Sequence, residues 1–210
     1  LRRQRQMCIR DRFWFDCTCP FAWLTSRWIK EVEKVRDIEV TFEPMSLSVL
    51  NEGRDLDAGY MEMMEANWGP ARVAAKIAVE APEKVDEFYT AMGTRIHTEG
   101  QGGKKGFGAY DAIIEQALDD VSLPADFATV ANTDEMDDTL KEFHNRGISE
   151  VGDEVGTPVV KFGHTAFFGP VITRVPTGEE AGELFDASVR LAQSPYFFEL
   201  KRSRTEDPQV

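Results

Sequence analysis

The chain has 210 residues, of which 42% are hydrophobic and 29% charged, and its formal net charge is −13 at pH 7. This length suffices for one domain with a sizeable core, or for one domain with an insertion. The acidic charge argues against nucleic acid or an anionic membrane as the partner, and we interpret it as a solubility feature. Apolar runs that alternate with helical patterns favour a soluble α/β protein.

Residues 1–12 differ in composition from the rest of the chain. They carry five arginines and one aspartate, and the first residue is not methionine. They contain no apolar stretch that fits a signal peptide or an anchor. The run is similar to sequence that translated metagenomic assemblies acquire from library adaptors. We therefore expect a non-native or disordered arm with an uninformative thiol at Cys8, and a basic targeting arm is the alternative.

A thiol directly follows the first predicted strand, a run of aromatic residues that ends just before Cys19. Leu24, Trp28 and Val32 then recur at helical spacing, and Pro20 marks the start of that helix. Free backbone N–H groups and the positive end of the helix dipole stabilise a thiolate at such a position. Cys19 is therefore a candidate nucleophile, although many cysteines are simply small buried hydrophobes.

A second strand is predicted over residues 38–42, paired in parallel with the first strand through the intervening helix. From residue 58 to residue 147 the pattern is helical, and prolines at Pro70, Pro82 and Pro124 are interpreted as helix starts. This block is too long for a loop, so we predict a helical insertion.

The glycine-rich run at residues 100–108 lies inside the predicted insertion. It fits neither the dinucleotide-binding pattern nor the phosphate loop that ends in Gly-Lys-Ser/Thr. We therefore interpret the run as a flexible connection.

Metal chemistry has little support in the sequence. His97, His144 and His164 are scattered without ligand spacing, and Cys17 and Cys19 have no second pair to complete a tetrahedral site. His97 is the histidine that could approach Cys19, and a structural role for it is the alternative.

The sheet is expected to resume past residue 147. Strands are predicted at 159–162 and 165–168, separated by a two-residue turn. Thr177 and Glu180 form a capping-box pattern that predicts a helix from there to about residue 193. The charged tail from Lys201 is expected to be partly ordered at most.

A Gly-Thr-Pro sequence opens the first of these late strands, with Pro158 at a position where it removes no ladder hydrogen bond. A strand, a Cys-Pro helix start and a late Gly-Thr-Pro strand together resemble the thioredoxin superfamily, in which the late proline is cis and faces the cysteine. The helical insertion resembles that of DsbA-like proteins. We therefore expect an α/β, thioredoxin-like fold with a large all-helical insertion. Residues 13–57 and 148–200 would form the thioredoxin-like domain, 58–147 the insertion and 201–210 a tail.

Several sequence blocks are more specific than the fold: Phe13-Trp14-Phe15-Asp16, Trp23-Leu24-Thr25-Ser26-Arg27-Trp28, Met45-Ser46-Leu47, Leu50-Asn51-Glu52, Tyr89-Thr90-Ala91-Met92-Gly93, Arg95-Ile96-His97, Val155-Gly156-Thr157-Pro158, Ala166-Phe167-Phe168-Gly169-Pro170 and Phe197-Phe198-Glu199-Leu200-Lys201-Arg202. Together they resemble the actinobacterial mycothiol-dependent nitroreductases of the DsbA-like group, over nearly all of the chain after residue 12.

This resemblance implies a cytoplasmic thiol oxidoreductase that uses mycothiol as co-substrate and reduces disulfides or nitroaromatic compounds. Cys19 stands at the position of the attacking cysteine. No tightly bound cofactor is expected. The expected partners are a low-molecular-weight thiol and a small organic or disulfide substrate, without nucleic acid or membrane, and the oligomeric state is left open.

The chain departs from the Cys-Pro-Trp-Cys pattern of that family, because it reads Cys19-Pro20-Phe21-Ala22. A dithiol can close its own disulfide, whereas a lone Cys19 needs an external thiol to resolve each mixed disulfide, as in a glutaredoxin-like monothiol cycle. Cys17 could replace the missing thiol only through a strained ring. A sequencing error at Ala22 is a further alternative.

The candidate catalytic residues are Cys19, Pro20, Thr157 and Pro158, the last two positioning the incoming sulfur or substrate through backbone contacts. The candidate substrate-binding residues are Phe21, Trp23, Trp28, Asn51, Trp68 and His97.

Two other functions fit a single thiol. Kappa glutathione transferases and hydroxychromene-carboxylate isomerases resemble this architecture and use one Ser or Cys to activate a bound thiol cofactor, without a disulfide cycle. A non-catalytic thiol-binding protein is the third hypothesis, and it predicts near-ordinary acidity for Cys19.

Overall fold

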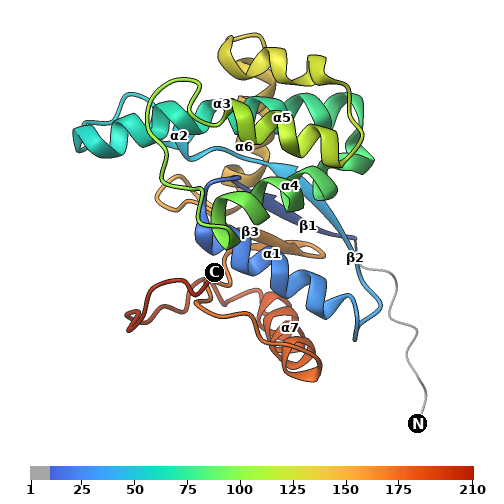
Figure 1. The fold of residues 1–210 in the computed structure, drawn as a ribbon. Coiled ribbons are helices and arrows are strands. Elements are labelled where there is room, and N and C mark those ends of the chain that lie inside the picture. The colour runs from blue at the N-terminus through green and yellow to red at the C-terminus, as the bar shows by residue number, and fades with distance from the viewer. Residues whose placement is uncertain (1–9) are drawn as a thin grey trace.

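The computed structural model describes residues 10–210 of the chain (Figure 1). The elements follow in this order: β1 (Arg10–Phe15), α1 (Pro20–Val32), β2 (Glu39–Pro44), α2 (Leu47–Leu50), α3 (Ala58–Glu80), η1 (Pro82–Lys84), α4 (Val85–Gly93), η2 (Thr94–Thr98, a π-helical turn), α5 (Asp111–Asp120), η3 (Ala125–Asn132), α6 (Asp137–Val151), β3 (Val159–Phe162), β4 (Thr165–Phe168) and α7 (Glu179–Ala192). None of the helices in this part of the chain is long and apolar enough to cross a bilayer.

The four strands form one mixed sheet in the order β2-β1-β3-β4. β1 pairs with β2 in parallel and with β3 in antiparallel orientation, and β3 and β4 form an antiparallel hairpin. The predicted sequence of strand, helix, strand, helical block, hairpin and helix is therefore confirmed. Figure 1 shows α3, α4 and α5 gathered at one end of the molecule and α7 at the other.

The aromatic residues of β1 form the centre of the core. Phe13 and Phe15 lie on one face of the strand, where Phe15 stacks on Tyr89 of α4 at 3.9 Å between ring centroids. Trp14 points to the opposite face, where it packs with Met45 in a separate apolar cluster. Both faces of β1 are therefore covered, which explains its continuous apolar run.

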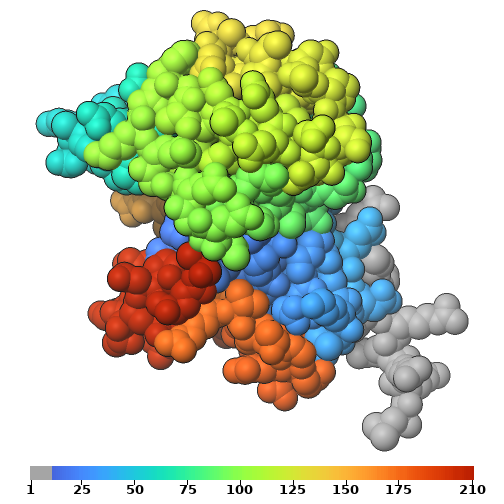
Figure 2. All heavy atoms as spheres, in the orientation of Figure 1, coloured from blue at the N-terminus to red at the C-terminus, as the bar shows by residue number. Residues whose placement is uncertain are grey.

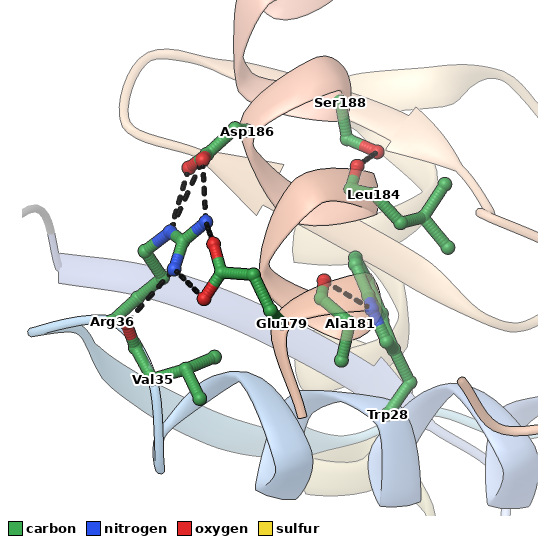
Figure 3. Close-up of polar contacts among 8 residues, drawn as sticks. All are labelled: Trp28, Val35, Arg36, Glu179, Ala181, Leu184, Asp186 and Ser188. Carbon is green, nitrogen blue, oxygen red and sulfur yellow. Dashed lines mark hydrogen bonds and ion pairs between the residues drawn. The ribbon is translucent and has the colours of Figure 1, made fainter. Parts of the chain in front are cut away.

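Helix α7 is attached to α1 by polar contacts that Figure 3 shows. The indole Nε1 of Trp28 donates to the carbonyl oxygen of Ala181 at 3.0 Å. The guanidinium of Arg36, just past the end of α1, pairs with Glu179 and Asp186, each at 2.7 Å. Because Arg36 is bidentate toward Asp186, the contact fixes the orientation of α7 as well as its position.

The first strand begins earlier than the sequence suggested. Arg10 to Arg12 belong to β1 and pair with Glu39 to Thr41 of β2, so these three residues are ordered, in contrast to the disordered arm that was one of the expectations. Asp11 is buried and accepts a hydrogen bond from the Gly163 N–H at 2.9 Å. The remainder of that segment, Cys8 included, lies outside the described residues.

Two helix starts differ from the prediction. α3 runs through Pro70 without a break, because Pro70 lies on a buried face whose packing outweighs its local preference. Pro82 does begin η1, and Pro124 directly precedes η3. Helix α7 has Gly178 at its N-cap, with φ of 57° and no side-chain cap, so the capping box expected from Thr177 does not form.

The C-terminal tail is docked on the loop that follows β4, in contrast to the expected partial order. The Gln209 N–H donates to the Thr173 carbonyl at 2.8 Å, and the Glu206 carboxylate pairs with Arg174 at 2.7 Å. Thr173 also donates its hydroxyl proton to Glu206. These contacts return the tail to the body of the protein.

Replacing Gly93 with Ala is expected to destabilise the protein, because the added Cβ would lie 2.3 Å from the Trp23 ring. Overpacking of this kind costs about 1–3 kcal/mol in the free energy of unfolding, to be measured by urea denaturation. Gly69→Ala is the matched control, since its Cβ meets nothing closer than 3.6 Å and Ala is the better helix former. Equal stability of the two variants would contradict the close contact.

Asp11→Asn is expected to change how stability depends on pH. Burial raises the pKa of Asp11 from 3.8 to about 6. The stability that the protonated carboxyl contributes is therefore complete below pH 3.8 and lost as the pH rises through about 6. An asparagine does not titrate. The difference in unfolding free energy, variant minus parent, should therefore increase from pH 4 to pH 7. A constant difference across this range would contradict the assignment.

Candidate functional site

Cys19 occupies the N-cap of α1, directly after the loop that ends β1. Pro20 is the first helical residue, and the Cys19 N–H donates to the Asp16 carbonyl at 3.1 Å. Only 6% of Cys19 is exposed. The helix start therefore places the thiol at an inner corner between the sheet and α1.

The structure brings Cys19 next to the peptide that precedes β3. Its Sγ donates to the Thr157 carbonyl oxygen at 3.6 Å, and the Thr157–Pro158 bond is cis. The buried hydroxyl of Thr157 has no partner with hydrogen-bond geometry among the described residues. The four candidate catalytic residues thus lie together, although 138 positions separate Cys19 from Thr157.

The acidity of Cys19 is set by opposing effects. Burial raises its pKa above the ordinary value, while the Thr157 side chain and the backbone N–H groups of Ala22 and Phe21 lower it, and the Asp16 charge raises it further. The donors expected at the helix start are present, but burial outweighs them. The resting thiol is therefore protonated at neutral pH, and the thiolate forms with donors already in place.

Asp16 is a residue of the site that the sequence did not single out. It is fully buried, and its carboxylate accepts hydrogen bonds from the Thr18 N–H at 2.8 Å, the Thr18 hydroxyl at 2.7 Å and the Leu47 N–H at 2.7 Å. Burial raises its pKa. These bonds fix the loop that carries Cys19 against the start of α2. The sequence signal for this role was an aspartate at the end of a strand, two residues before a threonine, because aspartate side chains often accept from the backbone N–H two residues on.

His97 lies beside the other cysteine of the loop. Its Nε2 is 3.0 Å from the Cys17 carbonyl oxygen, and burial lowers the pKa of His97 to about 4. The ring is therefore neutral at pH 7, and Nε2 carries the proton that it donates. His97 supports the backbone of the loop, and the structure records no contact between it and the sulfur of Cys19.

The thiol of Cys17 is buried, and burial raises its pKa well above the ordinary value. It is therefore a weak nucleophile at neutral pH. Within residues 10–210, no group of three or more His, Cys, Asp or Glu side chains could hold a metal ion.

The candidate aromatic walls divide into two sets. Trp23 stacks on His97 at 5.8 Å, and Phe21 is half buried on the first turn of α1, so both border the thiol loop. Trp28 instead faces α7, and Trp68 packs with Leu140 in a separate cluster of the insertion. Trp28 is therefore a core residue, and Trp68 is a partly buried residue of another interface. Helical periodicity identifies apolar positions but does not say which neighbour each one meets.

Asn51 ends α2, and its amide donates to the Leu47 carbonyl at 2.8 Å and to the Tyr60 hydroxyl at 3.5 Å. Burial raises the pKa of Tyr60, and the charge of Asp16 raises it further. Tyr60 was not among the predicted residues, and no local pattern marks it. Asn51 thus joins α2 to the start of α3.

The glycine-rich run at residues 100–108 is anchored, in contrast to the flexible connection expected. The N–H groups of Gly102 and Gly106 donate to the carbonyls of Ile96 and Glu62, each at 2.9 Å. The Lys104 N–H donates to the Tyr110 hydroxyl at 3.4 Å. The run is therefore a fixed loop that joins η2 to α5.

His97→Phe should keep the ring packed on Trp23 but leave the Cys17 carbonyl without its donor. An unsatisfied buried acceptor costs about 1–3 kcal/mol, so the variant should be less stable at pH 7 in urea denaturation. The pKa of His97 in the folded state is about 4, below its value of 6.5 in the unfolded chain. The parent therefore loses stability as the pH falls from 6.5 toward 4, and the gap should narrow at pH 5. The exposed His164→Gln serves as control, and a gap that is equal at both pH values would contradict the prediction.

Comparison with known proteins now identifies the family. Residues 18–202 match the family model described as mycothiol-dependent nitroreductase Rv2466c. A protein of Mycobacterium tuberculosis (strain ATCC 25618 / H37Rv), described as uncharacterized protein Rv2286c, is 30% identical over 199 residues, which are 92% of this chain and 81% of that protein.

Solved structures are similar in fold. The DsbA of Chlamydia trachomatis has a TM-score of 0.59 and 13% identity, with 91% of each chain covered. The cytosolic disulfide reductase DsbM of Pseudomonas aeruginosa, solved with GSH, has a TM-score of 0.56 and 9% identity, covering 86% of this chain and 99% of that one. The expected thioredoxin-like fold with a DsbA-like helical insertion is confirmed. The chain belongs to the family of the mycothiol-dependent nitroreductase Rv2466c, and it is a thiol-dependent oxidoreductase.

Proposed function

We propose that Cys19 runs a monothiol cycle with mycothiol as the electron donor. The observation that carries this proposal is the contact between the Cys19 Sγ, at the start of α1, and the Thr157 carbonyl oxygen. In addition, the position of the second cysteine of the family is occupied by a fully buried alanine, Ala22. With no thiol at Ala22, the mixed disulfide on Cys19 is left for an external thiol to resolve.

The cycle balances with two molecules of mycothiol. The Cys19 thiolate attacks the mycothiol sulfur of a disulfide between mycothiol and the substrate. The S–S bond breaks, the substrate leaves as a thiolate that takes a proton, and a Cys19–mycothiol disulfide forms. A second mycothiol thiolate then attacks the mycothiol sulfur of this adduct, releasing the Cys19 thiolate and oxidised mycothiol. The substrate sulfur is reduced, and two mycothiols end as one disulfide.

Nitroaromatic compounds fit the same electron count. Oxidation of two thiols to one disulfide releases two electrons and two protons. A nitro group that takes these up becomes a nitroso group and releases water. We propose this as a second substrate class, because the family is named for it.

The residues of the site have separable roles in this cycle. The N–H groups of Phe21 and Ala22 are fixed donors that stabilise the negative charge on sulfur as the thiolate forms, and the unpartnered Thr157 hydroxyl is available as a further donor. Thr157 and Pro158 place the incoming sulfur, and Phe21 and Trp23 provide apolar surface beside it. We place this reaction in the cytoplasm with a low-molecular-weight thiol as partner, in keeping with the mycothiol dependence of the family.

A kappa-type thiol transferase or an isomerase of the hydroxychromene-carboxylate type is the alternative. The raised pKa of Cys19 favours it, since a protonated thiol can donate a hydrogen bond to the sulfur of a bound thiol. That mechanism predicts turnover without net redox change and no disulfide on the protein. A non-catalytic thiol-binding role predicts neither turnover nor a disulfide.

The deciding experiment is intact mass spectrometry of the protein after exposure to oxidised mycothiol and, separately, to oxidised glutathione. We expect a single mycothiol adduct that is absent from Cys19→Ser, unchanged in Cys17→Ser and removed by reduced mycothiol. A Cys19 that forms no adduct with either disulfide would overturn the monothiol cycle.

A further inference from the structure

The C-terminal arm, defined as residues 195–210, returns to the first turn of the helix that carries Cys19. The guanidinium carbon of Arg204 lies 4.5 Å from the centroid of the Phe21 ring. Phe21 is two residues after Cys19, so the arm brings a cation to the border of the thiol loop. Figure 2 shows the C-terminal residues, in red, beside the N-terminal segment, in blue. The family match ends at residue 202, so Arg204 lies beyond the matched segment.

Two residues of the C-terminal arm, Glu206 and Gln209, anchor it to the loop after β4. Glu206, two residues after Arg204, pairs with Arg174 and accepts a hydrogen bond from the Thr173 hydroxyl. The Gln209 N–H donates to the Thr173 carbonyl. The loop that bears Thr173 is itself attached to α1, because the Thr25 hydroxyl donates to the Pro170 carbonyl at 2.8 Å. We name these contacts of Glu206 and Gln209 the Glu206 clasp.

The charge of Arg204 is not neutralised by its surroundings. No carboxylate of the described residues pairs with it, and its N–H groups make no hydrogen bond there. The chain as a whole has a net charge of −13, so this is a local cation on an acidic protein. A guanidinium on an aromatic ring keeps its N–H edge available for a carboxylate.

We propose that Arg204 determines specificity by drawing a carboxylate-bearing disulfide substrate to Cys19. The inference rests on the proposed function, since it names the substrate class for that same thiol. The guanidinium would pair with the carboxylate while the disulfide sulfur approaches Cys19 past Phe21. The Glu206 clasp would hold the arm so that the Arg204 guanidinium stays beside the Phe21 ring.

The test compares two aromatic disulfides that differ in charge. 5,5′-Dithiobis(2-nitrobenzoate) carries two carboxylates, and 2,2′-dithiodipyridine carries none. Both are reduced when Cys19 attacks one sulfur, which leaves a mixed disulfide on the protein and releases one aromatic thiolate that absorbance records. Cys8 and Cys17 are replaced by Ser in every variant, so that Cys19 is the sole thiol.

Arg204→Gln should slow the reaction with the dianionic disulfide about three- to tenfold and leave the neutral one within about twofold, because a steering charge is lost. Glu206→Gln should slow the dianionic reagent as well. This substitution removes a negative charge, so electrostatics alone would speed the reaction with the dianionic disulfide. A slower reaction therefore indicates that the Glu206 clasp has been released. Arg190→Gln, an exposed arginine on α7, is the matched control and should change neither rate.

The possible failures are distinguishable. If Arg204→Gln slows both reagents equally or leaves the ratio of their rates unchanged, the specificity role is overturned while the reactivity of Cys19 stands. If Cys19 reacts with neither reagent and forms no mycothiol adduct, the proposed function itself fails.

Discussion

The placement of β1 at the centre of the sheet is the constraint on which the site depends. β1 pairs with β2 on one side and β3 on the other, so the loop after Phe15 lies beside the residues that precede Val159. Asp16 then fixes that loop through three hydrogen bonds from Thr18 and Leu47. The sulfur of Cys19 and the Thr157 carbonyl meet because strand pairing brings the ends of their two segments together.

Burial and hydrogen bonding compete at Cys19, and the balance defines the resting state of the protein. Removal of the sulfur from water disfavours its charged form, whereas fixed donors at the helix start and the Thr157 hydroxyl favour it. The same donors would stabilise the thiolate of Cys19 when it leaves a mixed disulfide. A site of this kind keeps the thiol protonated between encounters and still supports the charged state that the chemistry requires.

Much of this architecture could be predicted from the sequence, because periodicity and proline placement are local signals. The order of elements along the chain and the helix start at Pro20 followed from them, and the proximity of Pro158 to Cys19 followed from the family resemblance. What failed depends on tertiary packing. Pro70 is tolerated inside α3 by burial, and Trp28, a candidate substrate-binding residue, faces α7. The contacts of Asp16 with Leu47 and of Arg204 with Phe21 join distant segments, and no single-sequence pattern encodes them.

The attachment of α1 at several points along its length has a mechanical consequence. Thr25 is bonded to the loop after β4, Trp28 to α7, and Arg36, beyond the end of the helix, to two carboxylates of α7 (Figure 3). A rotation of α1 as a rigid rod would have to break contacts at both ends simultaneously. Cys19 is therefore carried by a helix that is anchored along its length, so its sulfur keeps a constant position relative to the Thr157 carbonyl.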